Sequence, residues 1–319
     1  MQATGFQYFL LFFATFALVG TLTPVMRKIA ISKKIYDLPN AAHKTHKEPV
    51  PYLGGVAIII GVTLISYAAA IYKNFNKEDF LLLTSVLAPA IILGLIGLWD
   101  DLRNLRPGPR LVIQTVAGIF TAYILISQDT VGNPTGSQTL DAIITVIWIV
   151  GICNSINFFD NVDGGAAGTV AISSLGLFYL TFQNQQFFIA ALSSVTAGAT
   201  IGFLLWNKSP ARIYMGDAGA LFLGVLIATL TIRLQPDTDA LWKSFATPIF
   251  LLAVPILDTT TAVVSRISRG VSPLQGGHDH LSHRLVRKGL SRKHAVWCLW
   301  GVNLIPILFI VIFMNSRQQ

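Results

Sequence analysis

Long apolar runs alternate with short polar stretches along the whole chain. Each run is about twenty residues long, enough for a helix to cross the roughly 30 Å hydrocarbon core of a bilayer. The alternation of polar and apolar residues typical of a membrane barrel is absent. The pattern predicts an all-α, polytopic integral membrane protein with about ten transmembrane helices, at residues 6–26, 54–72, 80–99, 110–127, 140–158, 164–183, 187–206, 216–233, 243–265 and 294–314.

The ninth apolar run contains residues that disfavour a straight helix. Pro248 and Pro255 each lack a backbone N–H group, and Asp258 brings a carboxylate into the run. We therefore expect a kinked, partly hydrated ninth span. Because apolar runs continue along the whole length, we expect residues 1–319 to form a single transmembrane domain.

Charge adds an orientation to this picture. Only 12% of residues are charged, about half the usual share for a soluble domain, and the mean hydropathy is +0.62. The loops after the first, third, seventh and ninth runs hold 18 of the 23 Lys and Arg residues. These loops are expected in the cytoplasm, with both termini outside. Because the net charge of +8 is concentrated on one side, it does not indicate a nucleic-acid partner.

The odd-numbered loops also hold most side chains that could do chemistry, and all six histidines lie in or beside these loops. Side chains that can bind a metal lie on one membrane face and are surrounded by basic residues. This arrangement predicts an active site for an anionic substrate. Basic loops could instead only set topology or attract anionic lipid. That alternative does not explain the Asp, Asn and His residues among them.

Two acidic motifs stand at the ends of apolar runs. Asp100 and Asp101 follow the third run, and two neighbouring carboxylates suit Mg²⁺, which binds one or two carboxylates plus substrate phosphates. A solvated helix end is the alternative. After the fifth run, polar residues recur every three positions and would form one slowly drifting stripe on a helix. The stripe consists of Asn154, Asn157, Asp160 and Asp163.

The later loops supply one acid and a basic cluster. Asp217 lies between Gly216 and Gly219, which permit close approach, although an acid in a first helical turn is also a routine cap. The last loop has histidines at spacings of two and three. They could bind a metal such as Zn²⁺, but their basic surround favours binding of a diphosphate. This group comprises His278, Asp279, His280, His283 and Arg284, with Arg266, Arg269, Arg287 and Lys288 around it.

The first loop combines Pro and Gly residues with Lys44 and His46. Proline and glycine favour a shaped loop, and a shaped basic loop can hold phosphates. A linker that only sets topology is the alternative.

Together these loops resemble the polyprenyl-phosphate N-acetylhexosamine-1-phosphate transferase superfamily, of the MraY, WecA and TagO type. The resemblance covers residues 37–285. It rests on five motifs in the family order: the PxxGG end of the first loop, the DD pair, NxxNxxDxxDG, MGDxG and the final His loop.

The resemblance implies a reaction and a location. A polyprenyl phosphate, such as undecaprenyl phosphate, attacks the β-phosphate of a UDP-sugar to give polyprenyl-diphospho-sugar and UMP. The cofactor is Mg²⁺, for which Mn²⁺ could substitute. The implied setting is a bacterial-type inner membrane, with an active site in contact with membrane lipids and the cytoplasm, at the first membrane step of cell-envelope glycan synthesis. A homodimer is also consistent with the family.

Residue roles follow by motif match. Asp217 matches a Mg²⁺ ligand and catalytic residue, with Asn157 as a second ligand. Asp100 matches the acid proposed to receive a proton from the lipid phosphate. Because a phosphate at neutral pH is already largely ionised, Asp100 could instead orient the nucleophile or metal. Asp101, His280 and His283 are the other catalytic candidates, and the substrate-binding candidates are Lys44, His46, Asn154, Asp160, Asp163, His278, Ser282 and Arg284.

The chain departs from the family pattern at two positions. Ser282 stands at the middle His of the final motif, and Tyr52 stands where an Arg often precedes LGG. We expect Ser282, His278 or Arg284 to serve the diphosphate in place of that His.

The final loop also bears on the sugar. It reads HDHLSHRL, without the HHH run of the MraY branch, and is closest to the WecA/TagO branch. UDP-GlcNAc is therefore the predicted donor. A phospho-MurNAc-pentapeptide transferase, a membrane transporter of an anionic substrate and a non-catalytic relative are the alternatives.

Overall fold

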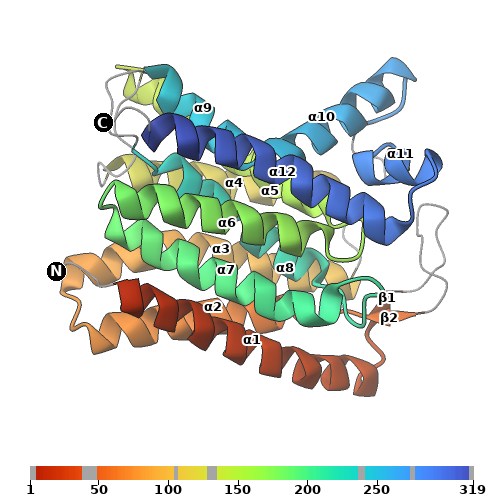
Figure 1. Ribbon diagram of the computed structural model, residues 1–319, viewed down its shortest axis with the longest axis horizontal. Coiled ribbons are helices and arrows are strands. Elements are labelled where there is room, and N and C mark those ends of the chain that lie inside the picture. The colour runs from red at the N-terminus through yellow and green to blue at the C-terminus, as the bar shows by residue number, and fades with distance from the viewer. Residues whose placement is uncertain are drawn as a thin grey trace.

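The computed structural model describes residues 5–37, 49–103, 107–127, 135–235, 241–273 and 277–315. These residues form a bundle of helices with one short hairpin at one end (Figure 1). The elements are α1 (Gly5–Ser32), β1 (Tyr36–Asp37), β2 (Val50–Pro51), α2 (Gly54–Tyr72), α3 (Lys77–Arg103), α4 (Pro107–Ser127), α5 (Gln138–Phe159), α6 (Gly165–Gln183), α7 (Phe187–Asn207), α8 (Gly216–Ile232), α9 (Leu241–Leu251), α10 (Ala253–Ser268), α11 (Leu281–Arg287) and α12 (Arg292–Asn315).

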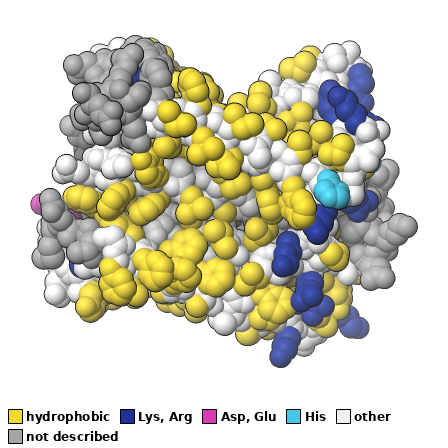
Figure 2. Space-filling view, viewed as in Figure 1, with side chains coloured by type: hydrophobic (Ala, Val, Ile, Leu, Met, Phe, Trp, Pro, Cys, Tyr) yellow, Lys and Arg dark blue, Asp and Glu magenta, His cyan; other side chains and the backbone are white. Residues whose placement is uncertain are grey.

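The helices confirm a multi-pass membrane protein. Among the described residues, 8 helices are long and apolar enough to cross a membrane, and the bent pair α9–α10 brings the number to 9. Helix α8 is apolar but too short for this count, and it lies at the place of the predicted span 216–233. Hydrophobic side chains cover the middle of the face in Figure 2, while most of its Lys and Arg residues lie toward one end. We call this end, which also carries β1, β2 and α11, the hairpin end.

The expected kink in the ninth span is a full break. Helices α9 and α10 meet at Leu252 and are bent by 80°. Pro255 cannot donate a backbone hydrogen bond to the carbonyl group four residues before it, so a continuous helix is interrupted here. The break directs α10 away from α12 toward the hairpin end (Figure 1).

Helix α8 forms the centre of the bundle. It packs against α2, α3 and α5, and every residue from Ala218 to Thr231 is buried. An apolar helix without a polar face needs apolar surroundings, which the neighbouring helices supply here. Because α8 begins at the hairpin end, Asp217 in its first turn lies where several other helices end.

Two glycine motifs are explained by close packing at the start of α8. A Cβ atom on Gly55 would lie 2.2 Å from the backbone nitrogen of Gly219. The backbone nitrogens of Gly54 and Gly55 donate to the carbonyl groups of Tyr214 and Met215, at 3.0 and 2.9 Å. The PxxGG and MGDxG segments therefore fit against each other, and this contact fixes the position of Asp217.

Replacing Gly55 with alanine is expected to lower the free energy of unfolding by about 3 kcal/mol, because the new methyl group must push α2 and α8 apart. Thermal unfolding of the detergent-solubilised protein, followed by tryptophan fluorescence, measures this. Gly151→Ala is the matched control, since a Cβ atom there meets nothing within 4 Å. Equal melting temperatures for the two variants would contradict the packing account.

Candidate active site

Four helices bring five polar residues together at the hairpin end. Asp100 and Asp101 come from the last turn of α3, Arg110 from the first turn of α4, Asn157 from the end of α5 and Asp217 from the start of α8. The Nδ2 atom of Asn157 donates to Oδ1 of Asp217 at 2.6 Å. Residues predicted from three separate loops thus lie in one cluster, which we call the carboxylate cluster.

Asp101 has a structural task in this cluster. Its two carboxylate oxygens accept hydrogen bonds from the backbone nitrogens of Asp217 (2.9 Å) and Ala218 (3.1 Å). These N–H groups belong to the first turn of α8 and have no partner inside the helix. A negative charge at a helix N-terminus is also favourable. Asp101 therefore caps α8 and holds Asp217 in place.

Arg110, which belongs to none of the predicted site motifs, bridges two predicted catalytic acids. Its Nη1 atom lies 2.8 Å from Oδ2 of Asp100 and 2.5 Å from Oδ2 of Asp217. Two carboxylates thus converge on one cationic nitrogen. The only sequence signal was a basic residue at the start of an apolar run.

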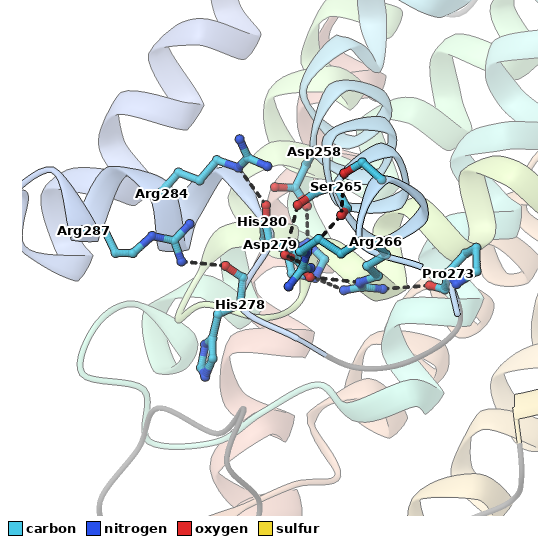
Figure 3. Close-up of polar contacts among 11 residues, drawn as sticks. Asp258, Ser265, Arg266, Pro273, His278, Asp279, His280, Arg284 and Arg287 are labelled. Carbon is cyan, nitrogen blue, oxygen red and sulfur yellow. Dashed lines mark hydrogen bonds and ion pairs between the residues drawn. The ribbon is translucent and has the colours of Figure 1, made fainter. Parts of the chain in front are cut away.

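A second cluster surrounds the histidine loop between α10 and α11 (Figure 3). Asp258, which is fully buried, accepts from Nδ1 of His280 at 2.7 Å and from the backbone nitrogen of Leu281 at 2.6 Å. On the other side of the ring, Arg266 lies 3.2 Å from Nε2 of His280. We call these residues the histidine-loop cluster.

The partners of His280 indicate its tautomer. A guanidinium group can only donate, so Nε2 of His280 accepts from Arg266 and carries no hydrogen. Nδ1 therefore carries the hydrogen that is donated to Asp258. His280 is only 5% exposed and has no free ring nitrogen in this arrangement. These contacts hold the histidine loop against α10.

Most of the basic residues predicted around the histidines form contacts within the loop itself. Arg266 and Arg269 both pair with Asp279, at 3.2 and 2.5 Å. Burial opposes ionisation of Asp279, but the hydrogen bond from Arg266 and the charge of Arg269 outweigh it and lower its pKa. Arg284 and Arg287 donate to backbone carbonyl groups, those of Asp279 and His278. These arginine side chains therefore stabilise the conformation of the loop.

The end of α5 joins the two clusters. Phe158, next to Asn157, lies under the guanidinium group of Arg266, whose carbon is 5.6 Å from the ring centroid. Asn161 accepts from the hydroxyl group of Ser282 at 2.6 Å. Ser282, at the position of the family's middle His, therefore anchors α11 to the end of α5.

The other members of the α5 stripe lie around this junction. Asp163 accepts from the backbone nitrogen of Ala211 at 3.1 Å and holds the loop before α8. Burial, followed by the charge of Asp217, raises the pKa of Asp160 well above its ordinary value. Asn154 points deeper into the bundle and donates to Gln114 on α4 at 2.7 Å. Lys44 and His46 lie outside the described residues.

His278 and His283 are separate from the hydrogen bonds of His280. The side chain of His278 is exposed and points away from the cluster in Figure 3. His283 packs edge-on against His278, with ring centroids 4.8 Å apart, and its buried Nδ1 has no hydrogen-bond partner. Burial, and then the neighbouring His278, lowers the pKa of His283 to about 4.

This shift predicts a pH dependence of stability. The ordinary His pKa is 6.5, so between pH 6.5 and about 4 the unfolded chain binds a proton at His283 that the folded protein does not. Stability should therefore fall as the pH drops through this window. We expect His283→Gln to weaken that fall by about 1 kcal/mol, a value reduced for solvent screening. Melting temperatures from pH 7.5 to 4.5 test this, with exposed His294→Gln as the control. Parallel pH profiles for wild type and His283→Gln would contradict it.

The carboxylate cluster fits a magnesium ion. No group of three or more His, Cys, Asp or Glu side chains arranged for a metal occurs among the described residues. Mg²⁺ needs fewer, because it takes one or two carboxylates and completes its shell with water and substrate phosphates. The convergence of Asp100 and Asp217 on one cationic nitrogen marks a position where positive charge suits both acids. The side-chain amide of Asn157 adds an oxygen of the same hard type.

Comparison with known proteins identifies relatives of this chain. The sequence model of glycosyl transferase family 4 matches residues 83–235. A probable undecaprenyl-phosphate N-acetylglucosaminyl 1-phosphate transferase of Bacillus subtilis (strain 168) is 32% identical over 310 residues, covering 96% of this chain and 84% of the relative. The phospho-N-acetylmuramoyl-pentapeptide-transferase of Streptococcus agalactiae serotype III (strain NEM316) is 28% identical, covering 94% and 96%. That of Streptococcus uberis is 27% identical, covering 81% of each chain.

The long apolar helices and these similarities together define a multi-pass membrane glycosyl transferase. The chain belongs to glycosyl transferase family 4.

Proposed function

We propose that the protein transfers N-acetylglucosamine 1-phosphate from UDP-GlcNAc to a polyprenyl phosphate, undecaprenyl phosphate in a bacterial membrane, and releases UMP. The observation that carries this proposal is the convergence of Asp100, Asp217 and Arg110 at the end of the bundle. The Bacillus subtilis relative, by its name, acts on undecaprenyl phosphate and an N-acetylglucosaminyl 1-phosphate. The reaction would be an early membrane step in cell-envelope glycan synthesis.

An apolar groove beside the two clusters suits the lipid substrate. A cavity of about 690 Å³ lies between α5, α8, α9 and α10. Its lining is mainly apolar and includes Trp148 and Ile152. It also includes Ser155, two residues before Asn157, and Thr259, next to Asp258. An isoprenoid chain in this groove would bring its phosphate to the carboxylate cluster.

The chemistry follows from this arrangement. An ionised oxygen of the lipid phosphate forms a bond to the β-phosphorus of the donor, and the bond from that phosphorus to the bridging oxygen of UMP breaks. The electron pair stays on the departing UMP, and no proton has to move. Catalysis of such a transfer calls for positioning and for neutralising charge on the phosphoryl oxygens.

We assign these tasks to residues of the two clusters. Arg110 would turn from the carboxylates to the diphosphate when the donor binds. Asp217, Asn157 and Asp100 would hold Mg²⁺, which neutralises diphosphate charge when bound. Asp101 and Asp258 position the groups that touch substrate. The hairpin end would face the cytoplasm, where a nucleotide sugar is available, and both termini would lie outside.

The test uses purified protein with undecaprenyl phosphate, Mg²⁺ and a panel of donors: UDP-GlcNAc, UDP-GalNAc and UDP-MurNAc-pentapeptide. We expect UMP release and a lipid diphosphate product with UDP-GlcNAc and a strong loss of activity in EDTA. Turnover only with UDP-MurNAc-pentapeptide would replace the proposed donor. No turnover with any donor would overturn the proposed reaction.

A further inference from the structure

The break between α9 and α10 leaves two backbone groups without a helical partner. The carbonyl group of Leu251 would normally accept from residue 255, but Pro255 has no N–H group. The N–H group of Val254 lies in the first turn of α10 and has no earlier helical carbonyl to reach. Both groups lie inside the bundle, where water is not available as a partner.

Two polar side chains from other helices satisfy these groups. Ser173 of α6 donates its hydroxyl hydrogen to the carbonyl oxygen of Leu251 at 2.7 Å. Asn303 of α12 accepts from the backbone nitrogen of Val254 at 3.3 Å and donates from Nδ2 to Oγ of Ser173 at 3.2 Å. Ser173 and Asn303 are both fully buried. The three hydrogen bonds form a chain, which connects the backbone on the two sides of the break.

One face of α10 connects these three hydrogen bonds to the histidine loop. Val254, Asp258, Ala262 and Arg266 are buried and follow each other at intervals of four residues, so they lie on one face of the helix. The first of them is held by Asn303. Asp258 and Arg266 each form a hydrogen bond with one ring nitrogen of His280. The direction of α10 at its first turn therefore decides where the histidine loop lies.

We propose that Ser173 and Asn303 are positioning residues for the active site, acting through the 80° break and α10 on the loop from His278 to His283. The functional part of this inference rests on the proposed transferase activity, whereas its structural part does not. Neither side chain touches the carboxylate cluster in the described structure. An apolar pair would leave the backbone groups at the break unpaired and α10 free to change direction.

The experiment measures geometry and kinetics in the same full-length protein. Spin labels are placed at Val264 on α10 and Leu205 on α7, two exposed positions, after Cys153 and Cys298 are replaced by alanine. Pulsed dipolar EPR gives the distance distribution between the labels in detergent or nanodiscs. The variants are Ser173→Ala and Asn303→Leu. Ser174→Ala is the matched control, because Ser174 is the next residue of α6, is buried, and its hydroxyl group has no hydrogen-bond partner in the described structure.

We expect Ser173→Ala and Asn303→Leu to broaden or shift the distance distribution and to lower kcat/KM for UDP-GlcNAc by about ten- to a hundredfold, mainly through KM. Ser174→Ala should change neither. Ser173→Ala removes a single oxygen, so it keeps the test usable if Asn303→Leu does not fold.

The outcomes are separable. An unchanged distance distribution in Ser173→Ala would overturn the proposal. A shifted distribution with unchanged kcat/KM would overturn its functional part. If the parent protein lacks turnover with every donor while the distribution still responds to Ser173→Ala, the proposed function fails and the structural part stands.

Discussion

Replacing Asp217 with asparagine is expected to lower transfer activity by about a thousandfold or more. Its carboxylate receives hydrogen bonds from both Asn157 and Arg110 and is the acid on which the carboxylate cluster is centred. Asparagine keeps the shape of the side chain but removes the negative charge, so a divalent cation loses its principal ligand. The measurement is UMP release at saturating lipid and donor.

The fold should survive this change. Asp101 caps α8 through backbone N–H groups, which Asp217→Asn leaves in place. We expect a melting temperature close to that of wild type and a monodisperse profile in size-exclusion chromatography. The control is Asp79→Asn, an acid in the first turn of α3, which should leave turnover unchanged. Retention of more than about a tenth of wild-type activity by Asp217→Asn would remove it from the catalytic centre.

The fold was largely predictable because apolar runs of membrane length leave little choice of structure. Helix α2 has the predicted bounds, Gly54–Tyr72: it begins at a pair of glycines, and Lys73 follows it. The break in the ninth span was indicated by its prolines. Its angle was not, because it depends on Ser173 and Asn303, which are far away in the sequence.

The membership of the site was easier to predict than the contacts within it. Asp100, Asn157 and Asp217 were expected together and lie together. The cap formed by Asp101 was missed, because the helix it caps begins more than a hundred residues later in the chain. Local spacing carries no information about such a partner. The same holds for His280, whose buried partner Asp258 belongs to an apolar span.

Replacing Arg110 with glutamine should have two effects of opposite sign. Transfer activity is expected to fall by about a hundredfold, because the diphosphate loses a cationic partner in a site with few free cations among the described residues. Affinity of the substrate-free protein for a divalent cation is expected to rise by about tenfold, corresponding to about 1.4 kcal/mol. The reason is competition: without substrate, the guanidinium group occupies the position between Asp100 and Asp217 that a cation would take.

Titration with Mn²⁺, followed by EPR of the free ion, measures the affinity in the absence of donor and lipid. Arg110→Lys should lie between wild type and Arg110→Gln in both properties, since lysine keeps the charge but loses the second donor of the planar fork. Arg103→Gln is the matched control, because Arg103 is an exposed cation at the end of α3 in the same region. A loss of Mn²⁺ affinity in Arg110→Gln would mean that the arginine organises the two carboxylates for the metal rather than competing with it, and the proposed turn of Arg110 toward the diphosphate would then be wrong.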